Sequence, residues 1–208
     1  MNRRAMIKPK LLFAIALSAV LPAALTACGP AAAPPAEITG TAIDGAAIGG
    51  PFELVDKDGK PVKWDDFAGQ YRIVYFGYTF CPDACPMDMG ILMQGFARFE
   101  KSHPALAAKV QPIFITIDPA RDTPARVGEF AAAFSPRLIG LTGTQAQIDV
   151  AVKAFKAVAA RGAETPGGYL MDHSRMAYLM DPAGKPIEAL PVDKNADAVA
   201  ADLAISVK

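Results

Sequence analysis

Two continuous apolar runs, 73–76 and 113–117, constrain the fold of this chain more than any other feature of its sequence. The first reads Ile-Val-Tyr-Phe and the second reads Ile-Phe-Ile-Thr-Ile. β-Branched and aromatic residues without polar alternation are typical of strands that are buried on both faces. Between them, residues 87–101 carry Ile91 and Phe99 in helical register, and Pro104 follows this segment. The chain therefore predicts an α/β fold with a central sheet between helices.

The rest of the sequence extends this alternation of strands and helices. An Asp58-Gly59 step between two short β-like segments predicts an N-terminal β-hairpin. Expected strands are 52–55, 61–63, 138–141, 176–180 and 187–190, and expected helices begin after Thr123, begin after Thr144 and span 196–207. We expect the second of these helices to carry an apolar face from Ile148 to Ala159. The pattern predicts a three-layer α/β/α sandwich with a β-hairpin extension.

A cysteine pair, Cys81-Pro-Asp-Ala-Cys85, follows the first apolar run directly. A strand that leads two cysteines to the start of a helix is the thioredoxin-like layout, although three residues separate the thiols here instead of two. Each cysteine precedes a proline, so we expect both thiols in the loop and helix cap rather than in the helix. Backbone N–H groups at a helix start are expected to lower the thiol pKa and to favour thiolate.

The spacing of Cys81 and Cys85 permits either a disulfide or two sulfurs on one metal ion. Thiolates select copper(I) or zinc, and one imidazole would complete a three-donor site. The sequence has only two histidines. His103 precedes Pro104 at a predicted helix end, and we interpret it as a solvated cap. His173 precedes a predicted strand, and by its chemistry alone it is either a structural residue or a ligand.

The N-terminus has the composition of a targeting segment. Four basic residues precede the apolar stretch 11–25, which is short for a membrane-spanning helix of roughly 20 residues. Small residues before Cys28 resemble a bacterial lipobox. We therefore predict that residues 1–28 are a lipoprotein signal peptide ending at lipidated Cys28, with an uncleaved signal anchor as the alternative. Residues 29–45 are a predicted Pro/Ala-rich tether, and 46–208 the folded domain.

This organisation limits the compartment and the partners. A lipidated Cys28 predicts a membrane-anchored lipoprotein on the periplasmic side of the bacterial cell envelope. In such an oxidising compartment Cys81 and Cys85 form a disulfide unless they are reduced or metal-bound. The chain has 21 basic and 21 acidic residues and no basic run, which disfavours nucleic-acid binding.

Several motifs together resemble the Sco (SenC) family of thioredoxin-like copper chaperones for cytochrome c oxidase assembly. They are the segments 78–86, 117–124, 141–144, 172–174 and 178–182, which occur in family order across 52–208. The resemblance implies that Cys81, Cys85 and His173 are copper ligands, for Cu(I) or Cu(II), and that the two cysteines also form a redox-active pair. It further implies an apo-cytochrome c oxidase copper subunit, or another cuproprotein, as the client, and a periplasmic thiol reductant as a second partner.

Other residues near these motifs have two interpretations each. Met87 and Met89 are either auxiliary soft ligands or, as we favour, packing residues on the first helical turn. Asp118, Arg121 and Asp122 either orient a partner protein or support the geometry of the ligands, or they form a turn and helix cap with a local ion pair. Asp172 is a weaker candidate for orienting the imidazole of its neighbour.

Three functions remain open at this level. The first is a copper-delivery chaperone, and the second is a thiol–disulfide reductase with Cys81 as the nucleophile, which keeps the cysteines of a cuproprotein reduced. The third is a copper or redox sensor. His173 separates the first two, because a reductase does not need an imidazole whereas the copper site does.

Overall fold

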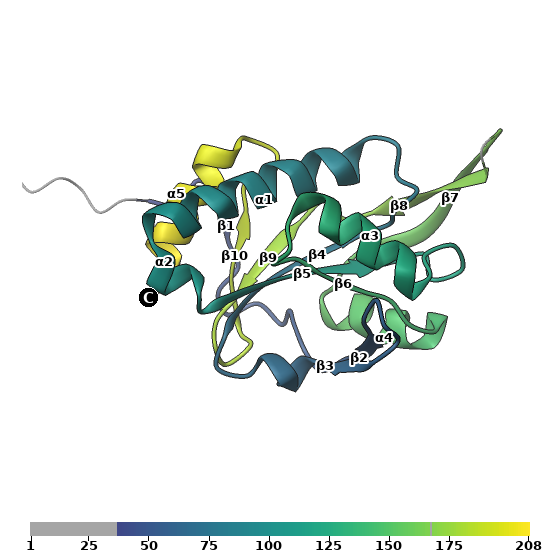
Figure 1. Ribbon diagram of the computed structural model, residues 1–208, viewed down its shortest axis with the longest axis horizontal. Helices are drawn as coiled ribbons and strands as arrows, with labels where there is room; N and C mark the ends of the chain where they lie inside the picture. Colours follow the sequence, from purple (N-terminus) through teal and green to yellow (C-terminus); the bar gives the residue numbers. More distant parts are fainter. Residues whose placement is uncertain (1–36, 167) are drawn as a thin grey trace, which may run out of the picture. The chain divides into compact units, whose positions relative to one another are not determined.

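A six-stranded mixed sheet forms the centre of the part of the chain that the computed structural model describes, residues 37–166 and 168–208 (Figure 1). In spatial order its strands are β1 (Thr41–Ala42), β10 (Pro186–Leu190), β9 (Ala177–Met180), β4 (Tyr71–Gly77), β5 (Val110–Thr116) and β6 (Ile139–Leu141). β4, β5 and β6 pair in parallel, and the other neighbours are antiparallel. The two apolar runs are thus the adjacent central strands β4 and β5.

Helices and a hairpin cover the two faces of this sheet (Figure 1). On one face lie α1 (Ala84–Ser102), α3 (Pro124–Phe134) and α5 (Ala196–Ser206), with the short α2 (Pro104–Ala107) following α1. On the other lie α4 (Gln145–Ala154), the hairpin of β2 (Glu53–Val55) and β3 (Pro61–Lys63), and the 3-10 turn η1 (Trp64–Phe67). The three-layer, thioredoxin-like α/β/α sandwich and its β-hairpin extension are therefore confirmed.

Consecutive residues of β4 supply the two cores on either side of the sheet. The Tyr75 ring stacks on Phe114 of β5 at a centroid distance of 6.4 Å, on the face covered by α1 and α3. The next residue, Phe76, points to the opposite face and packs against Phe155 and Tyr178. Because both faces are covered, every residue of β4 is buried, which explains its lack of polar alternation.

The sequence missed one hairpin, formed by β7 (Ala159–Thr165) and β8 (Gly168–His173). We expected Ala159 on the apolar face of the helix that follows Thr144. That helix ends at Ala154, Lys156 adopts a positive φ of 54°, and Ala159 opens β7 instead. The strand β7 is largely exposed and reads Ala-Ala-Arg-Gly-Ala-Glu-Thr, so it carries no period-2 apolar pattern.

The N-terminal predictions are tested only in part by the structure. The predicted signal peptide, including Cys28, lies outside the described residues. β1 falls inside the range 29–45 that was predicted as tether, yet it pairs with β10, so the sheet begins before residue 46. Within the described ranges, no helix has the length and apolarity needed to cross a membrane.

Candidate metal centre

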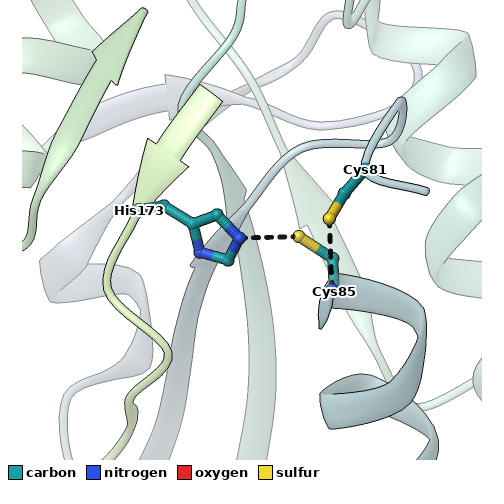
Figure 2. Close-up of side chains that lie close together, drawn as sticks. All are labelled: Cys81, Cys85 and His173. Atoms are coloured by element: carbon teal, nitrogen blue, oxygen red, sulfur yellow. Dashed lines mark hydrogen bonds between the residues drawn. The ribbon is translucent and has the colours of Figure 1, made fainter. Parts of the chain in front are cut away.

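Two adjacent segments and a third that is distant in sequence bring Cys81, Cys85 and His173 together (Figure 2). Cys81 lies in the loop after β4, Cys85 in the first turn of α1, and His173 at the end of β8. Their ligand atoms, two Sγ and one imidazole nitrogen, all lie within 4.8 Å of one another. Cys85 Sγ is 3.2 Å from His173 Nε2, and the backbone N–H of Cys85 donates to Cys81 Sγ at 3.3 Å. All three residues singled out in the sequence thus converge.

Gly77, the last residue of β4, makes room for the sulfur of Cys85. A Cβ atom on Gly77 would lie 2.9 Å from Cys85 Sγ and 3.0 Å from the rings of Tyr75 and Phe114. Such distances are too short for carbon, so any larger residue would displace the sulfur or the rings. Sequence reasoning did not single out this glycine, although its position between an apolar strand and the cysteine motif was visible.

The backbone carbonyl of Ser174 sets the tautomer of His173. The distance between His173 Nδ1 and Ser174 O is 2.9 Å, and because a carbonyl oxygen only accepts, Nδ1 must carry the proton. The lone pair of Nε2 therefore faces Cys85 Sγ, as a metal ligand requires. Asp172 does not take this role, because its carboxylate is exposed and lies beside Gly162.

The rings of Tyr75 and Tyr78 both pack against the imidazole of His173. Their centroids lie 6.2 Å and 5.9 Å from that of His173, and both rings meet it edge-on. Both tyrosines are buried. Since these contacts restrict the rotation of the imidazole, the orientation set by Ser174 is reinforced by packing.

The structure corrects two expectations about Cys85. This residue belongs to α1, which begins at Ala84, whereas we expected both cysteines outside the helix. The Cys85 side chain is fully buried, and this burial raises the pKa of its thiol well above the usual value, with the nearby Cys81 adding to the effect. The predicted stabilisation of thiolate by the helix start is therefore wrong for Cys85, because desolvation outweighs it.

An ion pair between a buried carboxylate and a half-exposed arginine, which the sequence did not indicate, lies next to the three residues. Asp88, one turn after Cys85, is fully buried, and its carboxylate accepts N–H groups of Arg175 at 2.6 and 3.0 Å and the hydroxyl of Tyr75 at 2.9 Å. Arg175 follows His173 by two residues. The pair therefore joins the helix that carries Cys85 to the segment that carries His173.

The acidic loop after β5 is also built into the fold. Asp122 is buried and accepts the N–H and hydroxyl of Thr79 and the hydroxyl of Thr116, so it fixes the chain just before Cys81. Asp118 pairs with Arg121, as one of the two interpretations expected, and it also accepts the Tyr169 hydroxyl at 2.8 Å. This last bond attaches β8, and with it His173, to the β5–α3 loop.

The remaining candidates are two methionines of α1 and the second histidine. Met89 is fully buried in the core, as its packing interpretation expected, whereas Met87 is 53% exposed. His103 forms the cap between α1 and α2, where it stacks on Phe99 and contacts Ser102 Oγ. Its interpretation as an exposed cap is therefore correct.

Alkylation of the reduced, metal-free protein tests the asymmetry of the two thiols. Iodoacetamide reacts with thiolate, and a raised pKa leaves less thiolate at any given pH. With Cys85 both buried and raised in pKa, we expect Cys81 to be modified at least about tenfold faster at pH 8. Peptide mass spectrometry over time measures both rates, and the unfolded protein, in which both thiols react alike, is the control. Faster labelling of Cys85 would refute the assignment.

Replacement of Arg175 tests its ion pair with the buried Asp88. Arg175→Met leaves the Asp88 carboxylate buried without its cation, so we expect the free energy of unfolding to fall by about 2–3 kcal/mol. Arg98→Met is a matched control, because Arg98 has the same 49% side-chain exposure but pairs with Asp197, which is 85% exposed. Its loss is expected below about 1 kcal/mol. Urea unfolding compares the two, and equal losses would contradict a special role for the Asp88 pair.

Comparisons with known proteins agree with this architecture. The sequence model of the SCO1/SenC family matches residues 40–208. The chain is 43% identical over 146 residues to "Protein SenC" of Rhodobacter capsulatus and 42% identical over 147 residues to "Protein SCO2, mitochondrial" of Saccharomyces cerevisiae. These alignments cover 69% of this chain in both cases, and 63% and 48% of the two relatives, less than two thirds of either.

Solved structures with bound copper have the same fold. Bradyrhizobium japonicum ScoI with copper bound is 37% identical with a TM-score of 0.68, and the match covers 76% of this chain and 98% of that one. Arabidopsis thaliana ScoI with copper bound is 34% identical with a TM-score of 0.71, covering 76% and 96%. With a family match over nearly the whole described region, a fold shared with these structures and the motifs around Cys81 and His173, this chain belongs to the SCO1/SenC family.

Proposed function

We propose that this protein is a copper chaperone that binds a copper ion through Cys81, Cys85 and His173 and delivers it to the copper subunit of cytochrome c oxidase or to another cuproprotein. The observation that carries the proposal is the convergence of two sulfurs and one imidazole nitrogen within 4.8 Å. Copper in the solved relatives that share 34–37% of the sequence supports the choice of ion. The family of the chain supports the choice of client.

The donor set suits a soft metal ion as cargo. Two thiolates and one imidazole favour copper(I) or zinc by ligand chemistry, and the same set also accepts copper(II). The Nε2 lone pair of His173 already faces Cys85 Sγ, so the imidazole needs no change of tautomer. The proton that burial retains on Cys85 would leave when a cation takes its place, which makes binding pH-dependent.

The exposure of the donors suits delivery rather than permanent storage. Cys85 is fully buried, whereas Cys81 is only partly buried and His173 lies at the end of a hairpin strand. A client ligand can therefore reach the ion from the Cys81 side and replace one donor at a time. Stepwise exchange of this kind keeps the ion coordinated throughout its transfer.

A thiol–disulfide reductase is the second candidate, and the closeness of the two sulfurs favours it. Cys81 is the more accessible thiol and would attack a client disulfide, and Cys85 would then resolve the mixed disulfide. A periplasmic thiol reductant would restore the reduced pair. Both activities use the same cysteines, so one protein can carry both.

Replacement of His173 separates the two candidates. We expect His173→Ala to weaken copper(II) binding by more than about 100-fold, because a direct donor is removed. Loss of a residue that only supports a metal ligand weakens binding by about 10–100-fold. Formation of the Cys81–Cys85 disulfide should be largely unchanged. Competition titration against a chelator and thiol counting under oxidation measure the two properties.

His103→Ala is the matched control for this experiment, since it removes the other histidine from the far end of α1. It should leave copper affinity unchanged. Equal affinity of His173→Ala and the unaltered protein would reject the copper site as drawn and leave the reductase as the better candidate.

We further propose that the protein is a lipoprotein of the bacterial cell envelope, anchored through Cys28 and facing the periplasm. The basic and apolar segments before Cys28 support this, together with a client that lies in a membrane. Labelling of cells with a palmitate analogue should mark the protein, and Cys28→Ser should abolish the label. Labelling of the Cys28→Ser variant at the normal level would reject this anchor.

A further inference from the structure

The loop that carries the more accessible thiol of the site borders a cavity. Because Cys85 is fully buried, a client thiol reacts at the partly buried Cys81. A cavity of about 380 Å³ lies against the loop that carries Cys81. It is lined by Phe80, Pro82, Arg121, Thr165, Tyr169 and Leu170. Two of these residues, Phe80 and Pro82, flank Cys81 in sequence, so an occupant of the cavity contacts the loop that carries its thiol.

Three guanidinium groups pack on the two aromatic rings of this cavity. Arg121 lies 3.7 Å from the centroid of Tyr169 and 4.8 Å from that of Phe80. Arg126 lies 4.6 Å from the Phe80 ring, and Arg161 lies 3.8 Å from the Tyr169 ring. We call these three arginines with Phe80 and Tyr169 the arginine–aromatic surface. Stacking on rings holds the guanidinium groups in place before any partner arrives.

The positive charge of this surface is only partly neutralised. Arg121 donates to the buried Asp118, but its Nη2 is buried without a hydrogen-bond partner among the described residues. Arg161 pairs with the exposed Glu164. Arg126 has no acidic group within ion-pair distance in the described part of the chain, and neither Asp83 in the cysteine loop nor Glu129 on its own helix reaches it.

The position of Arg126 and the exposure of Phe80 are both unfavourable for the isolated protein. Arg126 lies in the first turn of α3, where the helix dipole disfavours a cation and favours an anion. Phe80 is 41% exposed although it is a large apolar side chain. Aromatic and arginine side chains with such exposure are the residues that contribute most to protein–protein interfaces. An acidic and apolar partner segment would remove both costs.

We propose that the arginine–aromatic surface docks the client protein through a carboxylate side chain that the client carries next to an apolar residue beside its own thiols or metal ligands. The carboxylate would enter among Arg121, Arg126 and Arg161, and the apolar residue would cover Phe80. This assignment rests on the proposed function, and it names the chemistry by which the client is recognised. It applies equally to transfer of copper and to thiol exchange.

Thiol exchange with short peptides tests the surface without copper. The probes are acetyl-Asp-Phe-Cys-amide and acetyl-Lys-Phe-Cys-amide, which reduce the Cys81–Cys85 disulfide. The peptide thiolate attacks Cys81 Sγ, forms a mixed disulfide and releases Cys85 as thiolate, which takes up a proton. A second peptide thiolate then attacks the peptide sulfur and releases Cys81. The products are one oxidised peptide dimer and one reduced protein, and the two electrons come from the two peptide thiols.

We expect the Asp peptide to react about fivefold faster than the Lys peptide at low salt, when the rates are divided by the thiolate concentration. One unit charge of the surface at roughly 8 Å in water attracts the Asp peptide and repels the Lys peptide, and the two effects together give this ratio. By the same estimate this preference should reverse in Arg126→Glu, which inverts the charge, and it should vanish at about 0.5 M salt, which screens it. Lys153→Glu is the matched control, because it makes the same change of net charge on α4, across the sheet, and should keep the preference.

Each other result contradicts the proposal. Equal rates for the two peptides in the unaltered protein, or a preference that survives Arg126→Glu, would overturn it. A preference of 3-mercaptopropionate over cysteamine as large as that between the peptides would assign the surface to small anions instead of a protein client. Copper titration of Arg126→Glu, expected to match the unaltered protein, keeps the two proposals apart: absence of copper binding in both would reject the chaperone function and leave the peptide result valid.

Discussion

The site depends on one close contact, in which the sulfur of Cys85 packs over the bare backbone of Gly77. Only a residue without Cβ leaves room there, since that atom would lie 2.9 Å from Cys85 Sγ. The sulfur is thereby fixed at the end of the central strand, 3.2 Å from the unprotonated Nε2 of His173. Backbone packing sets one donor and a backbone carbonyl, that of Ser174, orients the other. Neither donor depends on a flexible side chain for its position.

Burial gives the two cysteines different properties. It holds the proton on Cys85 and leaves Cys81 as the more accessible thiol, so a single physical cause sets both the reactivity and the accessibility of the two thiols. Asp88 is also buried, and a carboxylate without water around it requires a cation. Its pair with Arg175 therefore stabilises the fold. That pair joins two segments more than 80 residues apart, so the geometry of the site is tied to the stability of the fold.

The sequence predicted the layers and the three converging residues, and it failed where local patterns are weak. The apolar runs at 73–76 and 113–117 show strands because both faces are covered. The β7–β8 hairpin was missed because most of β7 faces solvent and carries no alternation. Thiolate at Cys85 was expected from the helix start, but burial depends on tertiary packing, which no local pattern reveals. Asp88 was likewise invisible as a charge partner, since Arg175 lies far along the chain.

Copper transfer and thiol exchange impose the same demand on a client. Both require a foreign donor to come close to Cys81, because Cys85 is enclosed by Gly77 and the neighbouring rings. In thiol exchange the donor bonds to the Cys81 sulfur, and in copper transfer it would bond to the ion that this sulfur holds. Recognition on the Cys81 side therefore cannot distinguish the two activities, whatever its chemistry. The distinction must lie on the opposite side of the sulfurs, where only the imidazole of His173 contributes. An ion needs that third donor, whereas a disulfide forms between the two sulfurs alone.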